Sequence, residues 1–377
     1  MITPSIFIAT YIFIYLIFFF FLLLSASKTN FNSKVYYFIF IVTVSFVCGM
    51  RSQNVGTDTY AFYLLTKQMV LEHSFLWTKD YLYYGLTRSI YPYLGYQGVV
   101  LFPAIITVYL LAKSYKKILD EDNLQMNEAI QNRGLNISFY LLLSFVLLLN
   151  SSDFLFQIIN QTRQIMSLAF ALMGAISYFY KKRFIAIICF FCAVFSHHSS
   201  PLVIVCVFSA YYIRDTRLWI LLLLIVTFLS ISGISKELLS IAGLTIDEDS
   251  IYYQALNSNA VLYFKSGITC ALGITCYLVN RKRIDKKGFY NFLINLYFAI
   301  CVLAMLFIVY GEASNRIQRY AGVIFPILFV LSIRRIKITE LKIFIIVMLS
   351  LIYMIFLMNY DATLITIGIY RNINLPL

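Results

Sequence analysis

The stretch PSIFIATYIFIYLIFFFFLLLS, residues 4–25, decides the fold class of this chain. It carries no charged side chain, and it is about as long as the ~20 apolar residues that a helix needs to cross a bilayer. The segment Ser25-Ala26-Ser27 resembles a signal-peptide cleavage site. A secretory signal, however, has a basic start and an apolar core of about 7–15 residues, whereas no Lys or Arg precedes Lys28. We therefore predict a first spanning helix that stays in the protein.

The rest of the chain has a similar composition. Of its 377 residues, 61% are hydrophobic and 12% are charged, and about twice that charged share is usual in a soluble domain. A bilayer must therefore be the solvent for most of the chain. We predict an all-α, polytopic transmembrane helix bundle of about twelve membrane segments. The apolar runs lie at about 4–25, 35–50, 97–113, 136–150, 164–180, 184–196, 201–213, 218–235, 260–280, 289–310, 317–333 and 341–360.

The basic residues predict the orientation of these segments. If the N-terminus is outside, the inward loops hold 20 of the 30 Lys and Arg, and the opposite orientation would invert this bias. We therefore expect both termini outside. The net charge of +13 then belongs to the inner face, where it meets anionic lipid. Basic clusters between apolar runs also argue against nucleic acid as a partner, because nucleic acid would need a continuous basic stripe.

We expect one integral membrane domain, 1–377, with two large outward loops. The first loop, 51–96, is rich in Tyr and should lie largely along the headgroup region, partly as helices. The second loop, 236–259, is acidic. The runs 184–196 and 201–213 are short of the ~30 Å hydrocarbon core. They therefore form either two short, tilted helices or a re-entrant hairpin, and in both cases their polar turn lies below the outer surface.

Arginines stand at the predicted outer ends of three apolar runs. They are Arg51 after 35–50, Arg163 with Gln164 at the start of 164–180, and Arg316 with Arg319 at the start of 317–333. The planar guanidinium group suits phosphate oxygens, and the last two sites lie at helix N-termini, which also favour anions. The set predicts binding of a lipid-linked diphosphate. The alternative is that each side chain only extends to the lipid headgroups.

Two other kinds of side chain could transfer a proton. His197 and His198 lie in the turn between the two short runs, and a neutral imidazole suits proton transfer near pH 7. Either histidine could act as a base or a hydrogen-bond donor, or the pair could be a structural polar turn. Asp58 could be a base, an ionic partner of an arginine, or a turn cap after Gly56.

We expect no metal and no cofactor. Asp247-Glu248-Asp249 fits a solvated loop better than a cation site, because no other ligand lies nearby in sequence. Cys189 and Cys192 form a C-x-x-C inside an apolar run, where packing is the better explanation than zinc. The chain lacks a Gly-rich phosphate loop, a Rossmann fingerprint, G-x-S-x-G and H-E-x-x-H, which argues against a nucleotide-driven enzyme.

Four elements, in this order, resemble the EpsG/Wzy-type bacterial polysaccharide polymerases over residues 40–330. They are R-x(4)-G-T-D-T at Arg51–Thr59, Arg163-Gln164 opening a helix, H-x-S-x-L at His198–Leu202, and R-I-x-x-Y at Arg316–Tyr320. Pro201 stands where the pattern has a small residue. His197 has no counterpart in the pattern, so we favour His198 as the base.

The resemblance implies a glycosyltransferase that joins repeat units of O-antigen (in lipopolysaccharide), capsule or exopolysaccharide. Donor and acceptor would both be linked to undecaprenyl diphosphate, at the outer face of the bacterial plasma membrane. A chain-length regulator and a flippase are the implied partners.

The resemblance also implies roles for individual residues. Arg163, Arg316 and Arg319 would stabilise the leaving diphosphate, and His198 or Asp58 would deprotonate the acceptor hydroxyl. Arg51 would hold the second diphosphate or fix Asp58. The remaining predicted substrate-binding residues are Gln164, His197 and Tyr320.

Three other functions are alternatives to a polymerase. A ligase of related architecture would transfer finished polymer to a lipid A core. A flippase or transporter of lipid-linked oligosaccharide would need charges spread through its helices, whereas only Lys265 lies well within a predicted span. A membrane acyltransferase would not need several outer arginines.

Overall fold

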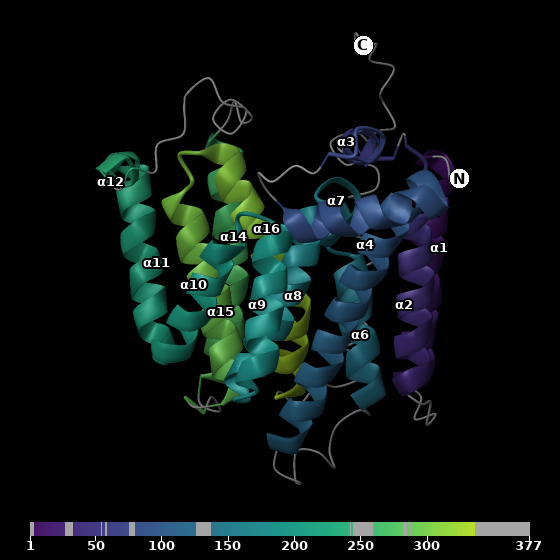
Figure 1. Ribbon diagram of the computed structural model, residues 1–377. Helices are drawn as coiled ribbons and strands as arrows, with labels where there is room; N and C mark the ends of the chain where they lie inside the picture. The colour runs from purple at the N-terminus through teal and green to yellow at the C-terminus, as the bar shows by residue number, and fades with distance from the viewer. Residues whose placement is uncertain are drawn as a thin grey trace. The chain divides into compact units, whose positions relative to one another are not determined.

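The computed structural model describes residues 4–26, 33–53, 55–56, 59–74, 80–125, 137–241, 243, 259–281, 285–286 and 288–335. Within these ranges the chain forms fourteen α-helices and no strand, which confirms the predicted all-α class for this part of the protein (Figure 1). The chain divides into two compact units, residues 1–201 with 337–377 and residues 202–336. We refer to them as unit 1 and unit 2 and describe each by itself.

Unit 1 contains eight described helices and the first two residues of a ninth. They are α1 (Pro4–Ala26), α2 (Ser33–Gly49), α3 (Thr59–Leu71), α4 (Tyr81–Gln125), α6 (Ile137–Leu149), α7 (Ser152–Asn160), α8 (Thr162–Phe179), α9 (Arg183–Ser196) and the start of α10 (Ser200–Tyr212). Helix α8 packs against α4 and α9, and α2 packs against α4. The contact of α8 with α9 is close, because a Cβ added at Gly174 would lie 2.6 Å from the Phe190 ring.

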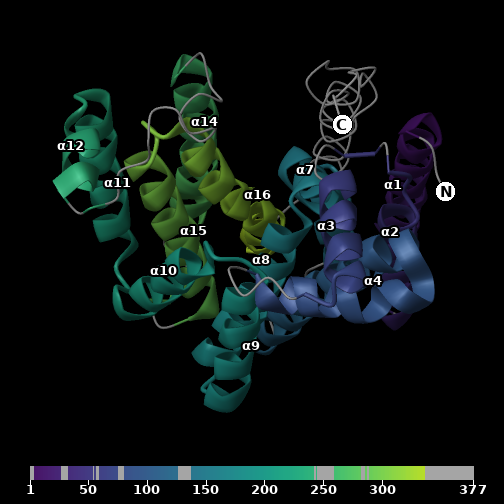
Figure 2. The same cartoon turned by 45° about the horizontal axis from the view of Figure 1, so that its top comes forward.

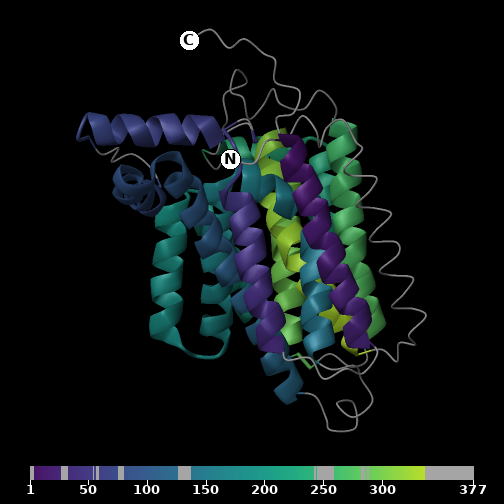
Figure 3. The same cartoon turned by 90° about the vertical axis from the view of Figure 1, so that its right-hand side faces the viewer.

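The predicted outward loop, 51–96, is largely helical in unit 1. Helix α3 lies across the direction of α1 and α2 (Figure 3). Helix α4 changes direction at Gly95, where φ is 54° and ψ is −140°, a conformation that glycine tolerates. The part of α4 before this break lies across the ends of neighbouring helices, and the part after it runs beside α6 (Figure 1).

Unit 2 is built around one buried helix, α15 (Phe289–Leu306). This helix packs against α11 (Thr216–Ile231), α14 (Asn259–Asn280) and α16 (Gly311–Arg334) (Figure 2). A further short helix, α12 (Ile234–Ile241), follows α11 after a bend of 98°. Gly233, with φ of 82°, lies at this bend.

Five helices are long and apolar enough to cross a membrane, and the bent pairs α6–α7 and α11–α12 raise the number to seven if each pair is one span. The chain is therefore a multi-pass membrane protein. The predicted total of about twelve segments and the outer location of both termini stay predictions, and the predicted segment 341–360 lies outside the described residues. The runs at 184–196 and 201–213 form α9 and α10, which are both shorter than the long spans.

Candidate functional site

Asp80 is the centre of a polar cluster in unit 1. It directly precedes α4 and has φ of 59°, a left-handed conformation that Asp adopts more readily than most residues. Its side chain is 0% exposed. A buried carboxylate is costly unless its oxygens are paired, and both oxygens of Asp80 have partners, one from α8 and one from the turn between α9 and α10.

Arg163 pairs with one oxygen of this carboxylate. It is the second residue of α8, and its Nη1 donates to Asp80 Oδ2 at 2.5 Å and to the Tyr84 hydroxyl at 3.0 Å. Its guanidinium carbon lies 4.4 Å from the centre of the Phe62 ring and 5.4 Å from that of Tyr84. These contacts fix the guanidinium near the N-terminus of α8, while the side chain remains 24% exposed.

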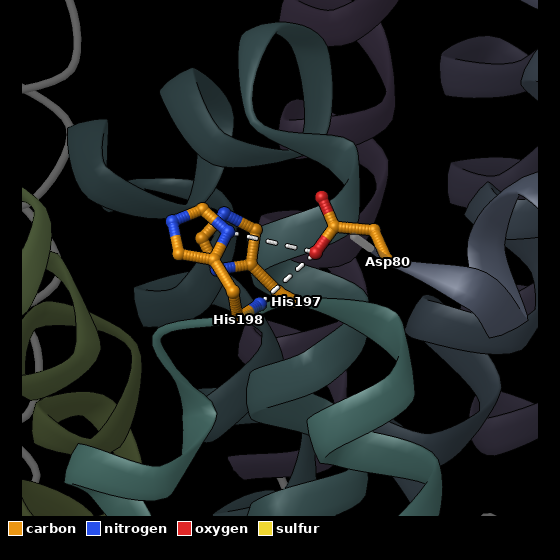
Figure 4. A group of neighbouring side chains, drawn as sticks. All are labelled: Asp80, His197 and His198. Atoms are coloured by element: carbon orange, nitrogen blue, oxygen red, sulfur yellow. Dashed lines mark hydrogen bonds and ion pairs between the residues drawn. The ribbon is translucent and has the colours of Figure 1, made fainter. Parts of the chain in front are cut away.

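The turn between α9 and α10 reaches the other oxygen. The backbone N–H of His198 donates to Asp80 Oδ1 at 3.0 Å, and the ring nitrogen Nδ1 of His198 lies 3.6 Å from the same oxygen (Figure 4). The carboxylate favours the tautomer of His198 that carries its proton on Nδ1, which leaves Nε2 as the basic nitrogen. The ring is 49% exposed, so an incoming molecule can reach it.

His197 stacks on His198 but has a different environment. The two ring centres are 4.4 Å apart, and His197 is buried. Its Nδ1 accepts a hydrogen bond from the backbone N–H of Ser199 at 3.1 Å and lies 2.8 Å from the Ser199 hydroxyl. A backbone N–H can only donate, so Nδ1 is unprotonated and the proton of neutral His197 is on Nε2.

This tautomer bears on metal binding. One ligand atom from each of Asp80, His197 and His198 lies within 4.8 Å of the others, a spacing that could hold an ion. Nδ1 of His197, however, is used by Ser199 and its Nε2 carries a proton, and one carboxylate oxygen of Asp80 is paired with Arg163. The contacts therefore favour hydrogen bonding and proton transfer over a metal centre.

The cluster stabilises the charged form of Asp80. Burial is the largest influence on the pKa of this carboxyl and acts to raise it. The hydrogen bond from His198 and the electrostatic interactions with His197, Arg163 and His198 together outweigh burial, so the pKa of Asp80 is lowered from its ordinary value. Asp80 is therefore an ionised acceptor near neutral pH.

Arg51 lies elsewhere in unit 1 and is 1% exposed. Its Nη1 donates to the carbonyl of Cys48, at the end of α2, and its Nη2 donates to the carbonyl of Ile159 at 3.2 Å, near the end of α7. Thr59, at the start of α3, donates to the same carbonyl at 3.0 Å. This burial favours a structural role, and the predicted contact of Arg51 with a diphosphate stays a prediction.

Unit 2 has a second basic cluster at the start of α16. Glu312 Oε1 lies 2.9 Å from Arg316 Nε and 3.9 Å from Arg319 Nη1. Lys265 of α14 donates to Asn315 in the same turns of α16, at 3.1 Å. One carboxylate thus faces two guanidinium groups, with a lysine close by, so positive charge is in excess at a helix N-terminus, as an anion site requires.

The comparison with protein families decides what kind of protein this is. The model of the EpsG family matches residues 34–371. The chain belongs to the EpsG family. This membership confirms the resemblance found in the four sequence elements and indicates a membrane protein similar to polysaccharide polymerases. No curated protein and no solved structure matches the chain.

Within each unit the structure brings together some of the residues predicted for this EpsG-family protein. Arg163, His197 and His198 lie in one cluster, whereas Arg316 and Arg319 form the basic cluster of unit 2. Gln164 and Tyr320 are buried within their helices, and their predicted substrate contacts stay predictions. Asp58 lies outside the described residues.

Sequence reasoning missed Asp80. The loop 51–96 of this EpsG-family chain contains three acidic residues, Asp58, Glu72 and Asp80. A carboxylate just before a Tyr-rich helix was the available signal, but it does not separate Asp80 from Asp58. The partners of Asp80 are 83 and 118 residues away in the chain, so only the tertiary structure identifies it.

Proposed function

We propose that this EpsG-family protein is a polymerase that joins oligosaccharide repeat units carried on undecaprenyl diphosphate. It would act at the outer face of the bacterial plasma membrane, in the synthesis of O-antigen, capsule or exopolysaccharide. The observation that carries the proposal is the arrangement in which buried Asp80 holds both Arg163 and half-exposed His198. A positioned cation and a positioned base next to each other are what a glycosyl transfer from a diphosphate needs.

The transfer needs no external energy source. In the proposed step, His198 Nε2 takes the proton of the acceptor hydroxyl, and the acceptor oxygen forms a bond to the anomeric carbon of the donor sugar. The bond between that carbon and the lipid diphosphate breaks, and the electron pair leaves with the diphosphate. Arg163 stabilises this developing negative charge, assisted by the N-terminus of α8.

Asp80 supports both groups in this mechanism. As an ionised acceptor it keeps the proton of His198 on Nδ1 and stabilises the imidazolium that forms when Nε2 takes a proton. It also limits the rotation of the Arg163 side chain. The stacking of Arg163 on Phe62 limits that side chain further, so less conformational entropy is lost when the diphosphate binds.

Unit 2 supplies a second anion-binding group under this proposal. The reaction has two lipid-linked substrates, and each carries a diphosphate. The excess of positive charge from Arg316, Arg319 and Lys265 over Glu312 suits one of these groups. The exposed fractions differ, with 29% for the Arg316 side chain and 8% for that of Arg319, so Arg316 is the one we expect to contact the phosphate oxygens.

The first experiment is replacement of Arg163 by Ala in the organism that makes the polysaccharide. We expect polymer to disappear while single-repeat material persists, because the donor loses its leaving-group stabilisation. Lys67→Ala, an exposed cation on α3, is the matched control and should leave the chain-length ladder unchanged. Wild-type ladders in the Arg163→Ala strain, at equal amounts of protein in the membrane, would contradict the proposal.

The accumulated product also separates the polymerase from its alternatives. A strain without the protein should accumulate single repeats at the outer face if the chain is the polymerase. Long chains that are not attached to their final acceptor would indicate a ligase, and lipid-linked repeats that face inward would indicate a flippase.

A further inference from the structure

Two buried serines connect the histidine turn to α8. The Oγ atoms of Ser167 on α8 and Ser200 at the start of α10 form a hydrogen bond, and both residues are 0% exposed. Ser200 Oγ also lies 2.8 Å from the carbonyl of Ala193 and 2.6 Å from that of His197. One hydroxyl group thus touches α8, the last turn of α9 and the histidine turn.

The donors in this group follow from its chemistry. A hydroxyl has one proton to donate and can accept two hydrogen bonds, whereas a carbonyl can only accept. The two nearby carbonyls favour a proton of Ser200 that is directed to Ala193 or His197. It follows that the bond between the two serines is donated by Ser167 and accepted by Ser200.

Ser167 lies on the same face of α8 as Arg163. The two residues are four positions apart, which places them one above the other along the helix. Arg163 contacts Asp80, and Ser167 contacts Ser200 one turn further along. Two neighbouring side chains on one face of α8 therefore act on His198. Arg163 holds Asp80, the carboxylate that orients His198, and Ser167 holds the turn in which His198 lies.

We propose that the Ser167–Ser200 pair is a positioning element for His198. It sets the register between the histidine turn and α8, and so sets the distance of His198 from Asp80 and Arg163. The proposal rests on the function proposed above, in which His198 takes a proton. It adds two residues that touch neither substrate and that control how the base is presented.

A positioning role predicts that loss of either serine lowers kcat but has little effect on KM. Arg163 remains in place when a serine is removed, so binding of the diphosphate should be retained. The base should be displaced, and a displacement of about 1 Å can cost about 100-fold in rate. We therefore expect Ser200→Ala to lower kcat about tenfold or more and to change KM less than twofold.

The test measures initial rates of polymerisation by the purified full-length protein in lipid nanodiscs. The substrate is the lipid-linked repeat extracted from a strain that lacks the protein. Each serine has a matched control, one on the far side of the histidine turn from Ser200 and one on α8 with Ser167. Ser196→Ala removes a buried hydroxyl of α9 that donates to Cys192 within its own helix, and Ser177→Ala removes a buried hydroxyl from α8.

Three results would support the proposal together. Ser167→Ala and Ser200→Ala lower kcat more than either control does, KM stays within twofold, and the double variant is no slower than Ser200→Ala alone. The last result is expected because both changes remove the same hydrogen bond. Serine variants with the kcat of their controls, or with additive losses, would overturn the positioning role.

Two variants distinguish failure of the positioning role from a folding defect and from failure of the proposed function. Ser167→Ala leaves Ser200 with a carbonyl acceptor and is the milder change, so it decides the result if Ser200→Ala does not give a folded protein. Arg163→Ala is measured in the same assay. Loss of activity in Arg163→Ala with control-like serine variants overturns only the positioning role, whereas wild-type activity in Arg163→Ala overturns the proposed function.

Discussion

Asp80 is the residue on which the unit 1 site depends. Its two oxygens each bind one partner, Arg163 from α8 and His198 from the turn after α9. A buried charge of this kind is stable only while its partners are present. The same contacts that neutralise the carboxylate therefore place a cation and a base on either side of it.

Replacing Asp80 by Asn should show this dependence. The side chain keeps its size but loses its charge, so His198 loses the acceptor that fixes its tautomer. We expect polymerisation by the purified protein to fall about 100-fold, at the lower end of what proton transfer by a positioned side chain contributes. Glu72→Gln is the control, since Glu72 is an exposed acid in the same loop that binds only Gln68 among its described contacts. Wild-type rates in the Asp80→Asn variant would contradict a role of Asp80 in the reaction.

The lowered pKa of Asp80 makes a prediction about stability and pH. An unperturbed Asp has a pKa of about 3.9, and the pKa of Asp80 lies lower in the folded protein. Its contribution to stability is therefore fully present above about pH 4 and is lost as the pH falls through the lowered value. The wild type should therefore have a higher thermal unfolding temperature than Asp80→Asn in detergent at both pH 7 and pH 5. A difference that already disappears at pH 5 would mean that the pKa of Asp80 is raised in the folded protein rather than lowered.

At the scale of elements, Arg51 connects the end of α2 to the end of α7. Removing it leaves the buried carbonyls of Cys48 and Ile159 without this donor. We expect Arg51→Ala to lower the free energy of unfolding by about 1–3 kcal/mol, as for other buried groups that lose a hydrogen-bond partner. Thermal unfolding of the purified protein measures this, with Lys67→Ala as an exposed control.

The same variant separates a structural role from a direct one. If Arg51→Ala keeps the wild-type unfolding temperature but makes no polymer, Arg51 contacts the substrate, as the sequence motif suggests. If the protein is destabilised and residual activity follows the amount of folded protein, Arg51 has a structural role through its buried contacts.

The helices were largely predictable because they are long apolar runs. The runs at 35–50 and 164–180 became α2 (Ser33–Gly49) and α8 (Thr162–Phe179), within two residues at each end. The bends were not predictable from hydropathy. The run at 218–235 divides at Ser232 and Gly233 into α11 and α12. Hydropathy does not mark this break, and the Ser-Gly pair was the available signal for a turn.

The site was predictable only in part, because some of its residues are distinguished only by partners that are distant in sequence. Arg163 and His198 stood out because polar groups at the ends of apolar runs need an explanation. Asp80 and the two serines did not, since a loop acid and a helical serine are common and only their distant partners distinguish them. The burial of Arg51 likewise depends on carbonyls from other helices.

At the scale of the whole molecule, family membership and the unit 1 cluster support one account. A multi-pass EpsG-family protein carries a buried carboxylate, an arginine at a helix N-terminus and a reachable histidine in one cluster. This combination suits a reaction whose donor is already activated by its own diphosphate. It predicts that the chain needs no nucleotide and no other protein for the transfer itself.

The most direct measurement is polymerisation by the purified protein alone. The full-length chain is placed in nanodiscs with undecaprenyl-diphosphate-linked repeats, without nucleotide, and the products are separated by length. The account predicts products of two and more repeats with release of undecaprenyl diphosphate, and neither from Arg163→Ala or His198→Ala. Product formation by both variants at the wild-type rate, or unchanged single repeats with folded wild-type protein, would contradict it.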